Sequence, residues 1–448
     1  MDYRVYVETL GCAKNQVDSE IMIGLLDQQR YLLTGDPEHA EVIVVNTCGF
    51  IESAKAESVD TILEMAQYKT TGRCKMLVVT GCLAQRYAEE LRLEIPEIDA
   101  LVGTGSFDTL IPVIDRVLKS QGTVVEMASI DKEFSEALPR IMLTPKHQAY
   151  LKIAEGCDNM CTYCIIPKLR GRYRSRVFED ILTEARALVA DGVTELIIIA
   201  QDITRYGIDR YLRYRLADLL YALNEIEGLR WIRLQYCYPD IINDELIEAI
   251  ASCEKVAHYI DMPVQHIDDN ILKRMNRRTS GEAIRSLIEK LRARIPDIAI
   301  RTTMIVGFPG ETEAEFEALA DFVKWASFDK LGVFPYSQEE DTPAALLPQQ
   351  LEDELKLERR DRIMEIQMGI SSELMANKVG LTLEVLIEEA VEDEDVYIGR
   401  TQYDAPEIDG VVYVNVPTDA EVDLEIGTYV QVRIADAMEY DLIGDLIL

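Results

Sequence analysis

Short apolar segments, each followed by a stretch long enough for a helix, recur along most of the chain and constrain its fold more than any other feature. The first series comprises "YRVYVETLG", "EVIVVNTC", "KMLVVTGC" and "IDALVGTG". Strands separated by helix-length connections pair in parallel, as βαβ units. We therefore predict an N-terminal α/β domain over residues 1–125, built around a parallel sheet.

A second series of such segments follows a predicted linker at residues 126–148, a region of weak periodicity that contains two prolines. The six segments are "AYLKIAEG", "ELIIIAQD", "WIRLQYCYP", "HYIDMPVQH", "IAIRTTMIVGFPG" and "KLGVFPYS". A full TIM barrel needs eight βα units. Six units predict an open, partial (β/α)6 barrel over residues 149–372.

The last part of the chain changes character. A long helix rich in Leu, Glu and Arg is predicted around residues 351–376, and five β-branched segments follow it at short intervals. Strands joined by turns and not by helices are typical of small all-β barrels. We predict an OB-like β domain over residues 373–448, which makes the whole chain α/β with an all-β C-terminal module.

The charge balance limits the partners of the chain. It holds 46 basic and 80 acidic residues, a formal net charge of −34. Such a chain repels nucleic acid and attracts basic partners. No segment approaches the roughly 18 apolar residues of a membrane span, and the start has no signal-peptide pattern. We expect a cytoplasmic protein with no membrane partner, whose clustered thiols stay reduced.

Three cysteines lie close together in the stretch "GCDNMCTYC", directly after the first strand of the second series. Cys157, Cys161 and Cys164 thus lie at the carboxyl end of a barrel strand, where barrel active sites lie. A structural zinc site would need a fourth ligand, and no Cys or His occurs in the next 60 residues. An iron–sulfur cluster with three thiolates and one free iron fits better, because that iron can bind a small molecule.

Three other cysteines are dispersed but share a position. Cys12, Cys48 and Cys82 each directly follow an apolar segment of the first series. The carboxyl ends of neighbouring parallel strands lie together, about 4.8 Å apart. These thiols can therefore reach one cluster, although buried structural cysteines are an alternative. The other cysteines, Cys74, Cys237 and Cys253, have no such placement and are predicted to be structural.

The order of these parts resembles the radical SAM methylthiotransferases across the whole chain. The matching stretches are "ETLGCAKNQVDSE", "VNTCGFIESA", "TGCLAQRY", "EGCDNMCTYCIIPKLRGRYRSR" and "GFPGETEAEF". The resemblance implies that the cysteines of the "GCDNMCTYC" stretch hold a catalytic 4Fe-4S cluster whose free iron binds S-adenosylmethionine (SAM). Cleavage of SAM there would release a 5′-deoxyadenosyl radical.

The same resemblance implies a second 4Fe-4S cluster on Cys12, Cys48 and Cys82, and a C-terminal TRAM domain. In this family a methylated sulfur on the second cluster couples to a carbon radical of the substrate, and a second SAM supplies the methyl group. An electron donor such as a flavodoxin or ferredoxin is also implied. A non-catalytic, zinc-stabilised interaction protein is the alternative from a different class.

Several stretches resemble the RimO branch, which modifies the β-carbon of an aspartate in the twelfth protein of the small ribosomal subunit. They are "QDITRYGID", "YCYPD", "MPVQHIDDNILKRMNRR", "FPYSQEEDTPAA" and "GRTQYDAPEIDG". Ile203 and Asp341 depart from the Thr and Gly that members often carry there. The resemblance implies a ribosomal protein, free or within the ribosome, as the partner.

Charge favours the same branch independently. Residues 381–448 hold 18 acidic residues against two Arg and no Lys, a balance of −16. A module that binds RNA needs Lys and Arg to neutralise phosphates, whereas this one would attract a basic ribosomal protein. A transfer-RNA methylthiotransferase, similar to MiaB, is the competing interpretation within the family.

Other residues are candidates for SAM contacts. Tyr163 has the aromatic position that in this superfamily often lies near the adenine, and Gln201 ends the second barrel strand. Gly307, Gly310 and Glu311 belong to "GFPGE", where glycines permit a tight turn close to a ligand. Packing or a plain strand–helix turn explains these residues about as well.

Other residues are predicted to have a structural role, and for a third group the role is left open. Glu195, at the amino end of its strand, is predicted to be structural, and His266 to be a hydrogen-bonded loop residue. The basic run Lys168, Arg170, Arg172, Arg174 and Arg176 could pair with the SAM carboxylate or with acidic neighbours.

Overall fold

A sheet of six parallel strands forms the N-terminal domain, in the order β2-β1-β3-β4-β5-β6. The two central strands, β3 and β4, are buried along their whole length. Alternate side chains enter different cores: Ile43 and Val45 lie on one face, and Val42 and Val44 on the other. The strands are β1 Arg4–Thr9, β2 Leu32–Leu33, β3 Val42–Thr47, β4 Met76–Gly81, β5 Ala100–Val102 and β6 Val124–Glu126. The helices are α1 Ala13–Gln28, α2 Glu52–Thr71, α3 Cys82–Arg86, α4 Ala88–Glu94 and α5 Leu110–Val117, with 3-10 turns η1 Pro37–His39 and η2 Phe107–Thr109.

The central domain is an open sheet of six parallel strands in the order β14-β13-β12-β11-β10-β7, which confirms the predicted partial barrel. Its strands are β7 Gln148–Lys152, β10 Glu195–Ile199, β11 Trp231–Leu234, β12 Val256–Asp261, β13 Ala299–Val306 and β14 Lys330–Pro335, and a small ribbon pairs β8 Ala154–Glu155 with β9 Arg174–Ser175. Its α-helices are α6 Ile166–Arg170, α7 Phe178–Ala190, α8 Ile208–Tyr211, α9 Leu216–Asn224, α10 Asp244–Ser252, α11 Asp269–Arg274, α12 Gly281–Arg294, α13 Glu313–Ala326 and α14 Asp353–Ala376. The 3-10 turns are η3 Ile203–Arg205, η4 Pro239–Ile241 and η5 Pro343–Leu346.

The two faces of the central sheet have different partners. Leu196 and Ile198 pack into the large core beneath the outer helices. Because side chains alternate along a strand, Ile197 and Ile199 face the inside of the partial barrel, where they pack against Val17 of α1. A helix of the N-terminal domain therefore covers part of the inner face of the central sheet.

The C-terminal module is a closed five-stranded barrel in the order β15-β16-β17-β19-β18, as predicted for an OB-like domain. The strands are β15 Thr382–Ala390, β16 Val396–Thr401, β17 Val412–Asn415, β18 Tyr429–Ala437 and β19 Leu442–Leu446. Val385, Val414 and Ile434 contribute to its own core. The long helix α14 leads into this barrel.

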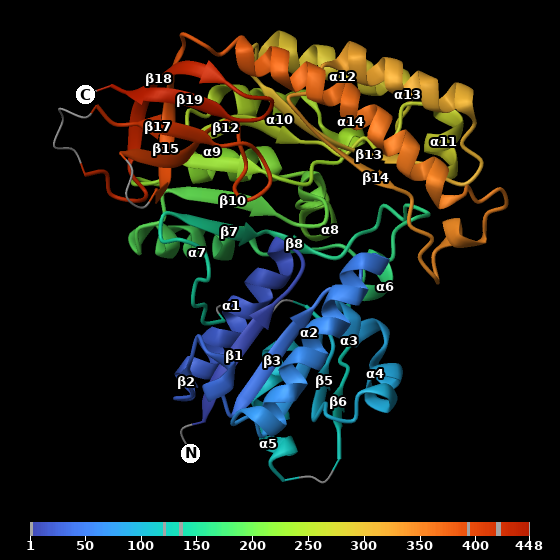
Figure 1. Cartoon of the computed structure of the whole chain (residues 1–448), viewed down its shortest axis with the longest axis vertical. Helices are drawn as coiled ribbons and strands as arrows, with labels where there is room; N and C mark the ends of the chain where they lie inside the picture. Colours follow the sequence, from blue (N-terminus) through green and yellow to red (C-terminus); the bar gives the residue numbers. More distant parts are fainter. Residues whose placement is uncertain (1–2, 120–121, 134–137, 392–394, 418–422, 448) are drawn as a thin grey trace.

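The computed structural model describes residues 3–119, 122–133, 138–391, 395–417 and 423–447, so part of the predicted linker and part of the acidic run at 388–395 lie outside the described residues. Figure 1 shows the N-terminal domain (blue) below the central domain (green to orange) and the C-terminal barrel (red) at the upper left. Within the described parts of the chain, no helix is long and apolar enough to cross a membrane.

Ion pairs attach the C-terminal barrel to the amino ends of the central strands. Glu195, the first residue of β10, is fully buried and pairs with Arg233 at 2.8 Å and with Arg400 of β16. Lys330, the first residue of β14, pairs with Asp404 at 2.7 Å. The predicted structural role of Glu195 agrees with this placement. The C-terminal barrel thus lies at the end of the central strands away from the "GCDNMCTYC" loop.

Candidate active site

The N-terminal thiol group consists of Cys12, Cys48 and Cys82. They follow β1, β3 and β4, which are neighbours in the sheet. A Cβ atom placed on Gly11 would lie 2.8 Å from Cys48 Cβ and 3.2 Å from its Sγ, so the Cys12 segment passes directly against Cys48. The topology therefore brings together three thiols that lie far apart in the sequence.

These thiols affect one another's ionisation. Burial raises the pKa of Cys48 to about 11, and the nearby thiols of Cys82 and Cys12 add to the rise. Burial also raises the pKa of Cys82. Desolvation raises the pKa of Cys12, but the positive charges of Lys14 and Arg170 outweigh it and lower that pKa overall. The group combines one thiol that is biased toward the thiolate with two that favour the protonated form.

The central thiol group consists of Cys157, Cys161 and Cys164, on the loop that follows β8. The loop is held from several sides. The Cys157 N–H donates to Gly171 O (3.1 Å), and the Thr162 N–H donates to Met275 O (3.0 Å). All three thiols are partly exposed. Burial raises the pKa of Cys157 to about 12 and that of Cys164 above its ordinary value, so metal binding there would release protons.

The N-terminal thiol group contacts the segment of the central thiol group at the domain junction. Cys82 packs against Ile165 and Leu169 in one buried cluster. Ile165 is the residue directly after Cys164. A side chain of the N-terminal thiol group therefore touches the segment that carries the central thiol group.

A buried set of four charges lies at the same junction. Arg170 Nη1 lies 2.6 Å from Asp18 Oδ2 and 3.3 Å from Glu155 Oε2, while Lys152 Nζ lies 2.6 Å from Asp18 Oδ1 and 3.0 Å from Glu155 Oε2. None of the four side chains is more than 8% exposed. Arg170 also donates to Asn15, whose carboxamide oxygen lies 4.0 Å from Cys82 Sγ. We call Asp18, Lys152, Glu155 and Arg170 the junction quartet; it links both thiol groups.

A second contact joins the domains beside Cys82. Arg86, at the end of α3, pairs with the buried Glu339 at 3.0 Å and donates to Gly49 O at 3.0 Å. Glu339 also pairs with Lys55 at 3.2 Å. Glu339 follows β14, so the end of the central sheet contacts the segments after Cys48 and Cys82.

Tyr163 and Gln201 both lie near the central thiol group. Tyr163 packs with Phe308 and Tyr336 and interacts electrostatically with Cys161. Gln201 donates to Glu155, two residues before Cys157, and its carboxamide oxygen is buried without a hydrogen-bond partner. That oxygen is a buried acceptor at the carboxyl end of β10, which is suited to a ligand donor.

The "GFPGE" turn follows β13 and is fixed by its glutamate. Gly307 (φ 71°) and Gly310 (φ 72°) take left-handed conformations, which glycine adopts at little cost. Glu311 is buried, accepts from the Gly307 N–H at 3.0 Å and pairs with Arg359 of α14 at 2.7 Å. The Glu311 carboxylate therefore already has protein partners, and a ligand contact here would come from the backbone.

The basic run has acidic partners within the protein. The pairs are Lys168 with Asp341, Arg170 with Asp18 and Glu155, Arg174 with Asp131, and Arg176 with Glu184. Arg172 donates its backbone N–H to Asp131. Of the two alternatives that the sequence left open, the geometry therefore favours acidic neighbours.

The remaining predicted positions lie in buried surroundings. His266 is fully buried and accepts from the Asp268 N–H at 3.0 Å through Nδ1, in agreement with a hydrogen-bonded loop residue. Cys74, Cys237 and Cys253 are buried as predicted for structural cysteines.

The donor chemistry of both thiol groups fits an iron–sulfur cluster. Each group offers three soft thiol ligands and no closed set of four, as a cluster with one open iron requires. Among the described residues, no three Cys, His, Asp or Glu side chains converge as ligands of a single metal ion.

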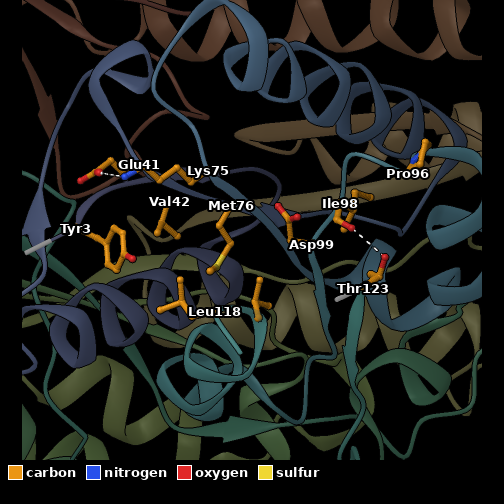
Figure 2. Close-up of a pocket in the computed structure, with 12 residues that line it drawn as sticks. Tyr3, Glu41, Val42, Lys75, Met76, Pro96, Ile98, Asp99, Leu118 and Thr123 are labelled. Carbon is orange, nitrogen blue, oxygen red and sulfur yellow. Dashed lines mark hydrogen bonds and ion pairs between the residues drawn. The ribbon is translucent and has the colours of Figure 1, made fainter. Parts of the chain in front are cut away.

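A separate cavity of about 260 Å³ lies at the other edge of the N-terminal sheet. Figure 2 shows Tyr3, Val42 and Met76 around it, with Lys75 bonded to Glu41. Val42 and Met76 begin β3 and β4, so the cavity lies at the amino ends of the strands, away from the thiols. It is therefore not part of the candidate site.

Comparison with known families agrees with this three-part organisation. Residues 4–103 match the uncharacterized protein family UPF0004, residues 151–323 match the radical SAM superfamily, and residues 379–447 match the TRAM domain. The superfamily match implies SAM and a 4Fe-4S cluster for the central domain.

Curated relatives match over the whole chain. One is the "Ribosomal protein uS12 methylthiotransferase RimO" of Clostridioides difficile (strain 630), which is 56% identical over 448 residues, with 99% of each chain covered. The chain belongs to the RimO family. The RimO protein of Desulfitobacterium hafniense (strain Y51) is 51% identical, with 100% of this chain and 99% of that one covered. RimO proteins are radical SAM methylthiotransferases, so the chain is an enzyme of that class.

Solved structures share the fold of this RimO family member. The radical SAM methyltransferase TsrM from Kitasatospora setae, with cobalamin and a [4Fe-4S] cluster bound, aligns with a TM-score of 0.56 and 15% identity over 77% of both chains. OxsB, a cobalamin-dependent SAM radical enzyme, aligns with a TM-score of 0.52 and 14% identity, covering 81% of this chain and 56% of that one. These similarities concern the fold alone.

Sequence reasoning missed several residues of the site. Lys14 and Asp18 lie on α1, whose sequence looks like that of an ordinary surface helix with mixed charges. Both are buried. The available signal was their position within one to two turns of Cys12, which places them beside the thiols as soon as Cys12 is accepted as a ligand.

Proposed function

We propose that this enzyme replaces a hydrogen on the β-carbon of one aspartate of ribosomal protein uS12 with a methylthio group, in the cytoplasm where ribosomes assemble. The observation that carries the proposal is the contact of Cys82 with Ile165, because it joins two thiol groups from different domains. One site for hydrogen abstraction and one for sulfur delivery must both reach the same carbon. The names of the relatives support uS12 as the substrate.

The two thiol groups have separate roles in this proposal. Cys157, Cys161 and Cys164 would hold the SAM-binding 4Fe-4S cluster, and Cys12, Cys48 and Cys82 would hold a second 4Fe-4S cluster. When bound, the first cluster with SAM would supply the one-electron chemistry that breaking an unactivated C–H bond requires. The second cluster would hold the sulfur that is transferred. The junction quartet orients the two thiol groups relative to each other. A flavodoxin or ferredoxin would supply the electron.

The charge of the C-terminal barrel supports a basic protein substrate. Three of its acidic residues pair with basic residues of the central domain: Glu384, Asp404 and Asp409. The acidic residues of residues 381–448 still far outnumber Arg400 and Arg433. Such a surface repels a phosphate backbone and attracts a ribosomal protein.

The test is methylthiolation in vitro under anaerobic conditions. The enzyme, SAM, a reductant and purified uS12 or the small subunit should yield uS12 with one added methylthio group on a single aspartate, measured by mass spectrometry. A uS12 variant with Asn at the target position should stay unmodified. Modification of transfer RNA in place of uS12 would contradict the proposal, as would zinc without iron and sulfide in the anaerobically purified enzyme.

A further inference from the structure

Lys14 is a buried cation that forms no ion pair with a carboxylate of the described residues. It is 6% exposed, and no carboxylate among the described residues lies within 4.0 Å of its ammonium group. The basic side chains around it are neutralised, since Lys152 and Arg170 both pair with Asp18 and Glu155. The thiol of Cys12 is the acidic group beside it. A buried cation without an ion-paired carboxylate is costly, so Lys14 is suited to receive a carboxylate from outside the chain.

The ring of Tyr236 holds the ammonium group in place. Lys14 Nζ lies 3.3 Å from the centre of that ring, a cation–π contact. Tyr236 (φ 66°) lies just beyond β11, and its N–H donates to Asp261 at 3.0 Å, which fixes the backbone at this point. The position of the charge is therefore set by the central domain, although the lysine belongs to the N-terminal domain.

This position lies beside Cys12 and near the segment that leads into the central thiol group. Lys14 is two residues after Cys12, and it interacts electrostatically with Cys12 and with Glu155, which precedes Cys157 by two residues. The helix α1 that carries it packs on the inner face of the central sheet through Val17. Figure 1 shows α1 at the junction, just below β7 and β8.

We propose that Lys14 is the residue that binds the side-chain carboxylate of the target aspartate. This inference rests on the proposed function. In aspartate, the β-carbon that loses hydrogen and gains sulfur is bonded directly to the carboxylate carbon. When that β-carbon is held where both thiol groups can act on it, the carboxylate must lie at the same junction. Lys14 provides a positive charge at that place, and no carboxylate of the described residues forms an ion pair with it. Its role is to select an acidic side chain and to position its β-carbon.

The experiment compares two probes, full-length uS12 with its native target aspartate and uS12 with Asn there. Anaerobic binding is measured with the holoenzyme and SAM by fluorescence anisotropy. We expect the wild-type enzyme to prefer the aspartate form about 10- to 100-fold, the value of a charge-assisted hydrogen bond. Lys14→Met should reduce this ratio to near one, because Met keeps the length of the chain but removes the charge. Lys14→Arg should retain most of the ratio.

Two controls separate this role from others. Lys75→Met removes an exposed lysine of the same domain, paired with Glu41 at the far edge of the sheet, and should keep the wild-type ratio. Iron and sulfide content and SAM affinity should be unchanged in Lys14→Met. An Asp/Asn ratio that persists in Lys14→Met overturns the inference. Loss of SAM affinity or of iron with the ratio intact also overturns it, in favour of contact with SAM or a cluster.

Failure of the proposed function would look different. If the wild-type enzyme leaves uS12 unmodified and binds both forms equally, the substrate assignment is wrong. If the wild-type enzyme modifies uS12 and Lys14→Met still discriminates between Asp and Asn, only the role of Lys14 is wrong.

Discussion

The guanidinium group of Arg170, on α6 of the central domain, lies 2.6 Å from the carboxylate of Asp18, on α1 of the N-terminal domain. Both side chains are almost fully buried. Arg170 also interacts with Cys82 and Cys12. One ion pair thus joins the domains and lies against the N-terminal thiol group.

Asp18→Asn should weaken this junction. The variant removes the carboxylate that Lys152 and Arg170 share at 2.6 Å, and breaking a buried ion pair costs about 3–5 kcal/mol. We expect a lower midpoint of chemical unfolding and less methylthiolated uS12 per 5′-deoxyadenosine formed. Asp321→Asn, which breaks an exposed pair with Lys324, should change neither quantity. If Asp18→Asn forms as much methylthiolated uS12 per 5′-deoxyadenosine as the wild type, this role of Asp18 is contradicted.

The triple variant Cys12→Ala, Cys48→Ala, Cys82→Ala should separate the two half-reactions. Iron should fall from about eight to about four atoms per chain, as expected for loss of one of two 4Fe-4S clusters. SAM cleavage should continue, measured as 5′-deoxyadenosine, while methylthiolated uS12 disappears. The converse variant at Cys157, Cys161 and Cys164 should lose both activities. Product formation by the first variant would show that the N-terminal thiol group is not needed for sulfur transfer.

Arg400→Met should loosen the C-terminal barrel. Arg400 is buried between Glu195 and Glu388, so its removal leaves Arg233 as the one ion-pair partner of Glu195 among the described residues. A cost of about 3–5 kcal/mol is expected, as for other broken buried pairs. Faster proteolysis after α14 would report the release of the barrel. Arg433→Met, at an exposed position of β18 in the same barrel, is the matched control and should behave like the wild type.

The contact of Asp404 with Lys330 should make stability depend on acid pH. Burial raises the pKa of Asp404, but Lys330 and Lys378 outweigh it and lower that pKa to about 2 in the folded protein. The pair therefore contributes fully above about pH 4, and its contribution of about 2 kcal/mol is lost as the pH falls toward 2. Asp404→Asn should remove it at neutral pH. Unfolding midpoints of both proteins should then converge between pH 4 and 2; parallel curves would contradict the assignment.

Much of the architecture could be predicted from local patterns. Apolar segments identified the six strands of the central sheet and the five strands of the C-terminal barrel, because strand formation depends on neighbouring residues. Strands β2 and β6 escaped prediction since Leu32–Leu33 and Val124–Glu126 are too short to form a pattern. These two strands form because each pairs with the edge strand of a sheet that the other strands have already built.

The candidate site divides in the same way. The sequence by itself determined which residues can be cluster ligands, because three thiols on one loop and three at strand ends follow from spacing and from the rules of parallel sheets. Only the tertiary structure decided how the two groups meet. Asp18 and Arg170 are 152 positions apart in the sequence, and Lys14 contacts Tyr236 of another domain. A hydrophobic pattern reports only on residues that are close in the sequence. These contacts, in contrast, form only after α1 has packed on the central sheet and brought distant charged residues together.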